Sequence, residues 1–285
     1  MEIKASQVKE LRDMSGVAMM ECKKALVECE GDIEKALDLL RSNSSLKAEK
    51  KASRVAADGV IRIVAADNYA TIIEINSETD FAAKDAGFIA FADEVAAFIA
   101  NNKINNKEEF LNTEIEKKRL SLVQTIGENI QLRRIETIDF NSSMSVGSYI
   151  HSDGKLATLV VTDSSESELA KDIAMHIAAS NPLCKSPEDI DNEVLEREKA
   201  IFETQARESG KDESIMERMV EGKVRKFLAE ASLISQAFIK DPDITVGNLL
   251  DGKKTEVIGY VRFKVGEGIE IESKSFADEV AEQLK

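Results

Sequence analysis

The residues best suited to chemistry form one compact acidic cluster. Glu78, Asp80 and Asp85 precede a predicted helix, and three such carboxylates could hold a divalent cation at the centre of a metal-dependent hydrolase. Oxygen-ligand cages normally need more ligands at defined spacing. Acids at a helix start also complement its positive end, so we favour a helix-capping role for Thr79 or Asp80.

The remaining reactive residues do not form a catalytic constellation in the sequence. His151 and His176 stand far apart with no serine or cysteine motif beside them, and the apolar pattern around His176 favours a core or interface position. Neither a GxxxxGK[ST] nor a GxGxxG phosphate loop occurs. Cys22, Cys29 and Cys184 lack CxxC spacing, which favours reduced thiols. We expect no enzyme, no cofactor and no nucleotide site within this chain.

Bulk composition favours a protein partner. The chain has 285 residues, which exceeds the usual size of one hydrophobic core, so we expect two or more packed units. A net charge of −15 disfavours nucleic acid, whose binding depends largely on clustered Lys and Arg. The basic run at residues 47–54 is interpreted as a solvated linker or helix face.

The N-terminal segment MEIKASQVKEL lacks the apolar stretch and cleavage site of a secretory signal. No segment approaches the roughly 18 consecutive apolar residues of a membrane span. We therefore predict a cytoplasmic protein without membrane contact.

A small helical domain is predicted at the start of the chain. Three- and four-residue spacing of apolar residues predicts helices over residues 6–13, 18–30 and 32–41. Ser15-Gly16 and Gly31-Asp32 separate them. The polar stretch at residues 42–57 is predicted to be a solvated linker with some helical character.

An α+β core comes after the linker and carries the acidic cluster. β-Branched runs at residues 60–64 and 69–75 predict a hairpin, and an apolar helix is predicted over residues 81–100. Displacing the chain by 87 positions, the distance from Ala70 to Ala157, superimposes Ala70-Thr71 on Ala157-Thr158 and Ala83-Lys84-Asp85 on Ala170-Lys171-Asp172. Gly59 and Gly147 open the two stretches at nearly that offset. We interpret this as two copies of one unit.

The second copy carries an insertion and is followed by a closing segment. Charged, helix-favouring stretches at residues 193–209 and 214–231 predict a helical hairpin that turns at Ser209-Gly210-Lys211. A strand at residues 256–265, a Gly266-Glu267-Gly268 turn and a terminal helix from Ser275 complete the chain.

The two copies differ at one informative place. At the 87-residue offset, Thr79, Asp80 and Phe81 fall opposite Glu166, Ser167 and Glu168. A requirement of the fold would keep an apolar residue at both positions, so Phe81 is predicted to lie exposed at a helix start. The alternative is that Phe81 packs inside the first copy.

These segments resemble the elongation factor Ts family along nearly the whole chain. VKELRDMSGVAMMECKKAL (residues 8–26) and SETDFAAKD (residues 77–85) resemble its two signatures. AADGVI, IGENI, MHIAAS, MVEGK and VGEGIE match in the right order. The family usually has Val after TDF, where this chain has Ala82.

The resemblance implies a guanine-nucleotide exchange factor that binds elongation factor Tu and promotes GDP release and GTP loading. It implies that Thr79, Asp80, Phe81 and Ala82 disturb the partner's magnesium site. Arg12, Met19 and Met20 would bind the GTPase domain, with the terminal helix returning to it. The residues implied for a more distant domain of the partner are Ile126, Gly127, Glu128 and His151.

The resemblance also divides the chain. It implies that residues 1–54 form a three-helix domain similar to ubiquitin-associated domains. Two core subdomains are implied, one at residues 55–140 and one at residues 141–184 with 233–264. A coiled-coil-like dimerisation hairpin at residues 185–232 and a C-terminal module at residues 265–285 complete the division. A homodimer and a heterotetramer with elongation factor Tu both remain open. The alternative function is a ribosome-associated or chaperone-like helical adaptor without exchange activity.

Overall fold

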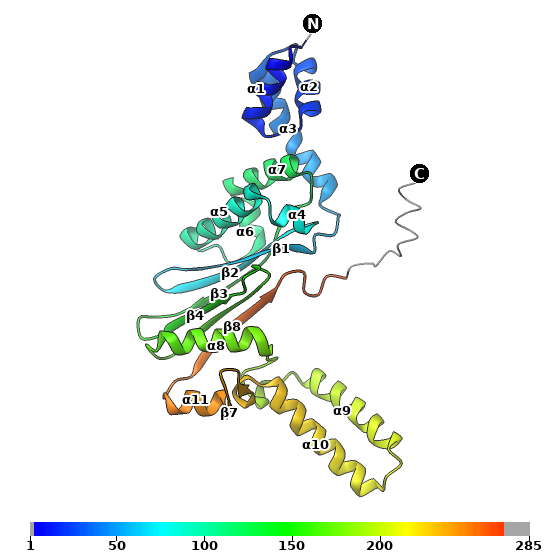
Figure 1. Ribbon diagram of the computed structural model, residues 1–285, viewed down its shortest axis with the longest axis vertical. Coiled ribbons are helices and arrows are strands. Elements are labelled where there is room, and N and C mark those ends of the chain that lie inside the picture. The colour runs from blue at the N-terminus through cyan, green and yellow to red at the C-terminus, as the bar shows by residue number, and fades with distance from the viewer. Residues whose placement is uncertain (1–2, 271–285) are drawn as a thin grey trace. The chain divides into compact units, whose positions relative to one another are not determined.

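A computed structural model describes residues 3–270 as an α+β protein, which agrees with the predicted class (Figure 1). Its residues divide into two units. Of the described residues, the first unit contains those within Met1–Val64, Thr71–Glu136 and Phe263–Lys285, and the second contains those within Ala65–Ala70 and Thr137–Arg262. The predicted helix from Ser275 lies outside the described residues.

Three helices open the chain: α1 (Ala5–Ser15), α2 (Met19–Glu28) and α3 (Ile33–Lys51). Gly16 ends α1 in the left-handed conformation at φ +68°, which glycine adopts without steric cost. The Asp32 side chain caps α3 by accepting a hydrogen bond from the Lys35 amide at 3.1 Å. Both predicted helix breaks are confirmed. The apolar faces form a small core of Val8, Leu11, Val17, Cys22, Ala25, Leu26, Ala36 and Leu40.

The third helix corrects the prediction of a linker at residues 42–57, because α3 continues to Lys51. Ser44 and Ala48 are buried at four-residue spacing beyond Leu40, so the helix keeps an inner face. Ala48 joins the core of the first sheet, and α3 packs against α7 (Glu114–Ile126). These tertiary contacts outweigh the polar composition that suggested a linker.

The first sheet has the strand order β1-β2-β3. Its strands are β1 (Asp58–Ala65), β2 (Tyr69–Ser77) and β3 (Gln131–Asp139). The predicted hairpin of β1 and β2 is confirmed, and the Ala66 amide donates to the Tyr69 carbonyl at 2.8 Å in its turn. The helices that follow β2 are α4 (Asp80–Ala83), α5 (Ala86–Asn102), α6 (Lys107–Leu111) and α7.

Helix α5 supplies much of the core beside this sheet. Its buried side chains share one cluster with Ile73 and Ile75 of β2 and with Leu132 of β3. The α5 members are Phe88, Phe91, Ala92, Val95, Ala96 and Ile99. This apolar helix is therefore fixed by burial on the sheet.

The second sheet has the order β4-β5-β8, formed by β4 (Ser145–Ile150), β5 (Leu156–Thr162) and β8 (Val257–Lys264). β4 and β5 are antiparallel, with Ser145 opposite Thr162 and Ile150 opposite Ala157. Helix α8 (Ser167–Ser180) packs on β4 and β5 (Figure 1). A Cβ on Gly147 would lie 2.1 Å from the Ala170 carbonyl, so this glycine allows helix and strand to approach closely.

The helical hairpin lies between α8 and β8 in the sequence. Helices α9 (Asn192–Glu208) and α10 (Glu213–Ala231) pack side by side, and Gly210 has φ +64° in the predicted turn. Figure 1 shows their antiparallel course. The Phe202 and Phe227 rings meet edge to face at 6.4 Å between centroids. Small elements then lead to β8: β6 (Ala237–Phe238), β7 (Asp241–Thr245) and α11 (Val246–Gly252).

Candidate functional site

The segment after β2 forms a short turn of helix instead of the start of a long one. The prediction of one helix over residues 81–100 is wrong, because α4 ends at Ala83 and α5 begins at Ala86. Asp85 causes the break. Its carboxylate accepts hydrogen bonds from the Gly87 and Phe88 amides at 2.8 and 3.2 Å and thereby starts a new helix. We call residues 78–83 the Phe81 turn.

Phe81 lies at the tip of this turn. The residue is 82% exposed, the largest exposed fraction among the large hydrophobic residues of the described chain. The neighbouring Ala82 and Ala83 are buried. The prediction of an exposed Phe81 is confirmed, and the alternative of an internal ring is wrong. Burying this ring in a partner would be worth about 1.5–3 kcal/mol.

Thr79 and Asp80 complete the exposed part of the turn. Thr79 is the N-cap of α4, and its hydroxyl accepts a hydrogen bond from the Ala82 amide at 3.3 Å. The Asp80 carboxylate accepts a hydrogen bond from Lys84 at 2.7 Å. That bond and the charge of Asp80 raise the pKa of Lys84. The predicted capping role of Thr79 is confirmed.

Glu128 holds the turn from the end of α7. One of its carboxylate oxygens accepts hydrogen bonds from the Glu78 and Thr79 amides, both at 3.0 Å. The other oxygen accepts from the Thr79 hydroxyl at 2.7 Å. A carboxylate that accepts two N–H donors makes strong, charge-assisted bonds. The structure thus brings Glu128 and Thr79 together, which no spacing in the sequence indicated.

Glu78 makes the reciprocal contact, from the Phe81 turn to the segment after α7. Its carboxylate accepts a hydrogen bond from the Asn129 amide at 2.6 Å and lies 3.5 Å from the Arg54 guanidinium. The buried Asn129 side chain donates to the Arg54 carbonyl at 2.8 Å and to the Ala52 carbonyl at 3.4 Å. We call Glu78, Thr79, Glu128 and Asn129 the two-carboxylate clamp.

Ile126 and Gly127 lie immediately before this clamp. Ile126 is partly buried against the core of the first sheet. Gly127 ends α7 at φ +88°, and its amide donates to the Val123 carbonyl at 3.0 Å. The Gly127 turn therefore directs the chain so that Glu128 can reach the Phe81 turn.

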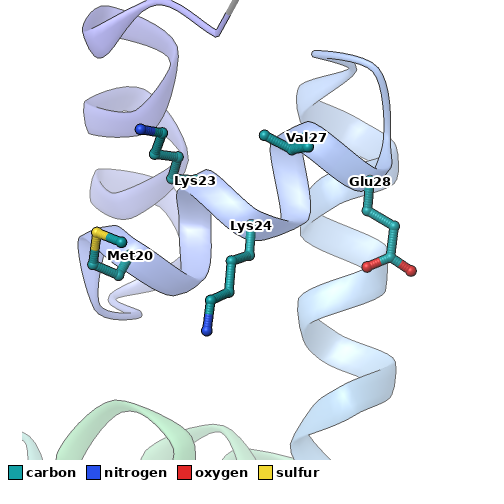
Figure 2. Close-up of a pocket in the computed structure, with 5 residues that line it drawn as sticks. All are labelled: Met20, Lys23, Lys24, Val27 and Glu28. Atoms are coloured by element: carbon teal, nitrogen blue, oxygen red, sulfur yellow. The ribbon is translucent and has the colours of Figure 1, made fainter.

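The predicted N-terminal binding residues lie on α1 and α2. Arg12 is exposed, and Met19 and Met20 are 46% and 65% exposed. Figure 2 shows Met20 on α2 beside a shallow pocket lined by Met20, Lys23, Lys24, Val27 and Glu28. Met20 and Val27 give this pocket an apolar lining, and Lys23, Lys24 and Glu28 give it charged neighbours. The flexible thioether of methionine suits contact with an irregular apolar surface.

The two histidines belong to the second unit and differ in setting. His151 is exposed, with Nδ1 3.0 Å from the Asp153 carboxylate. His176 is fully buried; its Nδ1 accepts from the Ile239 amide at 3.2 Å, so Nε2 carries the proton and donates to the Gln236 oxygen at 2.9 Å. Burial lowers the pKa of His176. The predicted core position of His176 is confirmed.

The acidic cluster of the sequence is dispersed in space. Glu78 binds the Asn129 amide, Asp80 binds Lys84, and Asp85 caps α5. Residues 3–270 contain no group of three or more His, Cys, Asp or Glu side chains arranged to hold a metal ion. Within the same residues, no helix is both long and apolar enough to cross a membrane.

Comparison with known proteins gives the family. The sequence profile described as "Elongation factor TS" matches residues 78–267. Elongation factor Ts of Hahella chejuensis is 50% identical over 285 residues, covering 99% of each chain. The proteins of the same name from Saccharophagus degradans and Teredinibacter turnerae are 48% and 47% identical, and each alignment covers 100% of this chain and 98% of the relative. The chain therefore belongs to the elongation factor Ts family.

Proposed function

We propose that this chain is a guanine-nucleotide exchange factor of translation elongation, which binds elongation factor Tu carrying GDP and promotes GDP release and GTP loading. The observation that carries the proposal is the 82% exposure of Phe81, on a turn whose backbone amides bind the Glu128 carboxylate. An exposed aromatic ring on an ordered support loses little conformational entropy when it binds.

The Phe81 turn acts as a wedge. Phe81 enters the partner near its magnesium site, and burial of the ring provides free energy for displacing the groups that hold the ion and the phosphates. Asp80 brings a carboxylate to the same place, with Lys84 bound to it. Thr79 caps the turn, and Ala82, buried in its own chain, anchors it.

The exchange requires no bond chemistry. If binding of this chain weakens the partner's hold on GDP by some factor, GDP weakens the binding of this chain by the same factor, because the coupling free energy is reciprocal. Exchange then proceeds through a transient complex of the two proteins and the nucleotide. The overall equilibrium between GDP and GTP forms is unchanged, so the chain acts without a catalytic acid or base and without a nucleotide site.

Further surfaces complete the proposed complex. Arg12, Met19 and Met20 bind the GTPase domain, and Ile126, Gly127 and His151 face a more distant domain of elongation factor Tu. Glu128 lies next to Gly127 in the chain, but its carboxylate binds the Phe81 turn of its own chain. Residues 1–54 then serve as a docking domain similar to ubiquitin-associated domains. The two duplicated core subdomains are residues 55–140 and, for the second, residues 141–184 together with 233–264. The hairpin at residues 185–232 serves dimerisation, residues 265–285 return to the GTPase domain, and the complex forms in the cytoplasm.

The test is the release of fluorescent GDP from elongation factor Tu. The wild-type chain should accelerate release, and Phe81→Ala combined with Asp80→Ala should slow it roughly 10- to 30-fold, as expected for loss of about 1.5–2 kcal/mol at an aromatic anchor. Glu168→Ala, at the exposed counterpart of Phe81, should behave like wild type. A folded double variant with unchanged release would exclude the wedge.

A second measurement separates exchange from adaptor activity. The affinity of this chain for elongation factor Tu should fall when GDP is in excess, because the coupling is reciprocal. An adaptor that only docks would bind equally well with and without GDP.

A further inference from the structure

Glu128 has an internal role that differs from contact with a partner. Both carboxylate oxygens are occupied by the Phe81 turn, through the two amides at 3.0 Å and the Thr79 hydroxyl at 2.7 Å. The residue is only partly exposed. An acceptor whose lone pairs already bind its own chain has little capacity left for a partner.

We propose that Glu128 is a positioning residue for nucleotide exchange, which acts by holding the Phe81 turn in its binding geometry. This inference rests on the proposed function. The α4 helix has a single turn and is separated from α5 by the Asp85 cap, so the long helix does not fix the direction of Phe81. The carboxylate of Glu128 supplies the missing constraint from the end of α7.

The two-carboxylate clamp also connects the turn to α3. Glu78 binds the Asn129 amide, and the buried Asn129 side chain binds the carbonyls of Ala52 and Arg54 just after α3 ends. The same α3 contributes Ala36 and Leu40 to the N-terminal helical core. The clamp therefore sets the place of Phe81 relative to the helix that carries the proposed docking domain.

The experiment is a double-mutant cycle between Glu128→Ala and Phe81→Ala, read out as GDP release from elongation factor Tu. We expect Glu128→Ala alone to slow release roughly tenfold, within the usual range of coupling between sites. In the Phe81→Ala background, Glu128→Ala should cause no further slowing, because the ring that Glu128 positions is absent. A direct contact with the partner would instead give additive losses and would overturn the inference.

Two further readouts distinguish positioning from general damage. Amide exchange at Glu78, Thr79 and Ala82 should become faster in Glu128→Ala, while exchange in α5 stays unchanged. Glu128→Gln should recover most of the rate, because its oxygen can still accept both amides and its NH₂ can donate to the Thr79 hydroxyl oxygen. Failure of Gln to recover any of the rate would indicate that the charge acts on the partner, against the inference.

The controls keep the two proposals separate. Glu108→Ala, an exposed acid on α6 of the same unit, should leave release unchanged. If Glu128→Ala does not fold, Thr79→Val enters the same cycle with a smaller expected effect. It removes the hydroxyl's bonds to Glu128 and to the Ala82 amide and leaves the two amide bonds to Glu128 in place. A wild-type chain that does not accelerate release would overturn the proposed function and this inference together. Wild-type acceleration with an unaffected Glu128→Ala would overturn only the inference.

Discussion

The two sheets carry similar elements and differ in the helical segment that comes after the central strand. In both, a hairpin pairs an edge strand with the central strand, and helix begins soon afterwards. After β5, α8 runs unbroken from Ser167 to Ser180. After β2, a single turn of helix is capped by Thr79, ends at Ala83 and is succeeded by a new helix.

The side chains at corresponding positions show which residues the fold requires. Ala82 and Ala83 are buried, and so are their counterparts Leu169 and Ala170. The position before them is exposed in both places, yet it is occupied by Phe81 in one and Glu168 in the other. An aromatic ring at an exposed position adds little to the folded chain, so the exposed Phe81 supports the proposed role in binding a partner.

The glycines that open the two stretches also differ. A Cβ on Gly147 would lie 2.1 Å from backbone atoms of Ala170 in α8. A Cβ on Gly59 would instead lie 2.1 Å from the Ile75 carbonyl of the neighbouring strand, at a φ of +146°. The two glycines therefore have different roles, because Gly147 permits close packing of a helix and Gly59 permits close packing of a strand.

The largest effect that tests this comparison is expected for Gly147→Ala. The added methyl would push α8 away from β4, and overpacking of this kind should lower the free energy of unfolding by about 3 kcal/mol. Urea unfolding measures the loss. Hydrogen exchange should rise across α8 and β4, whereas Gly59→Ala should raise it across β1 and β2. Identical exchange patterns for the two variants would contradict the distinction. Gly222→Ala is the control, because nothing lies within 4 Å of its added Cβ.

A second test uses His176, whose counterpart at the 87-residue offset is Ile89. Burial lowers the pKa of His176 below the ordinary value of 6.5, so the folded chain binds this proton less readily than the unfolded chain. Above pH 6.5 His176 is neutral in both states, and its contribution to the free energy of unfolding is fully present. It falls as the pH drops toward the folded pKa, by at most about 1.4 kcal/mol per pH unit for one proton.

Urea unfolding between pH 7 and pH 5 measures this dependence. His176→Gln cannot gain a proton in this range, so it should remove that part of the slope. An unchanged slope in His176→Gln would assign the pH dependence to other groups.

The smallest expected effect is the change in stability when the N-cap side chains of α4 and α8 are removed. Thr79→Ala removes the side-chain cap of α4 together with the hydroxyl bond to Glu128, and should cost about 1 kcal/mol of stability. Glu166→Ala, at the corresponding place before α8, removes no cap bond and only an exposed pairing with Lys253 at 3.7 Å, so it should change stability by less than about 0.5 kcal/mol. Thermal or urea unfolding of both variants gives the comparison. Equal losses would mean that the two helix starts are held alike.

Local patterns in the sequence predicted several elements because they act over a few residues. Gly16 and Asp32 end and begin helices through their own backbone and side-chain preferences. Tyr69–Ser77 is β-branched throughout much of its length, and the α9 and α10 hairpin turns at Gly210. The comparison of Phe81 with Glu168 also needed only the sequence, since the repeat supplied its own reference.

Long-range packing decided the features that depend on distant residues. The extension of α3 to Lys51 results from packing of Ala48 in the core of the first sheet, so its polar composition was misleading. The elements α6, α7 and β3 were not predicted. Most importantly, Glu128 and Thr79 are 49 positions apart, and their contact exists only because α7 ends beside β2.

The amino-acid sequence alone was therefore sufficient for the α+β class, the helix breaks, the helical hairpin and the exposure of one aromatic residue. These features result from backbone preference, apolar periodicity and the comparison of two similar segments. The support of that aromatic residue arises only in the folded chain, because a carboxylate can bind two amides and a hydroxyl only after folding brings them within 3.0 Å.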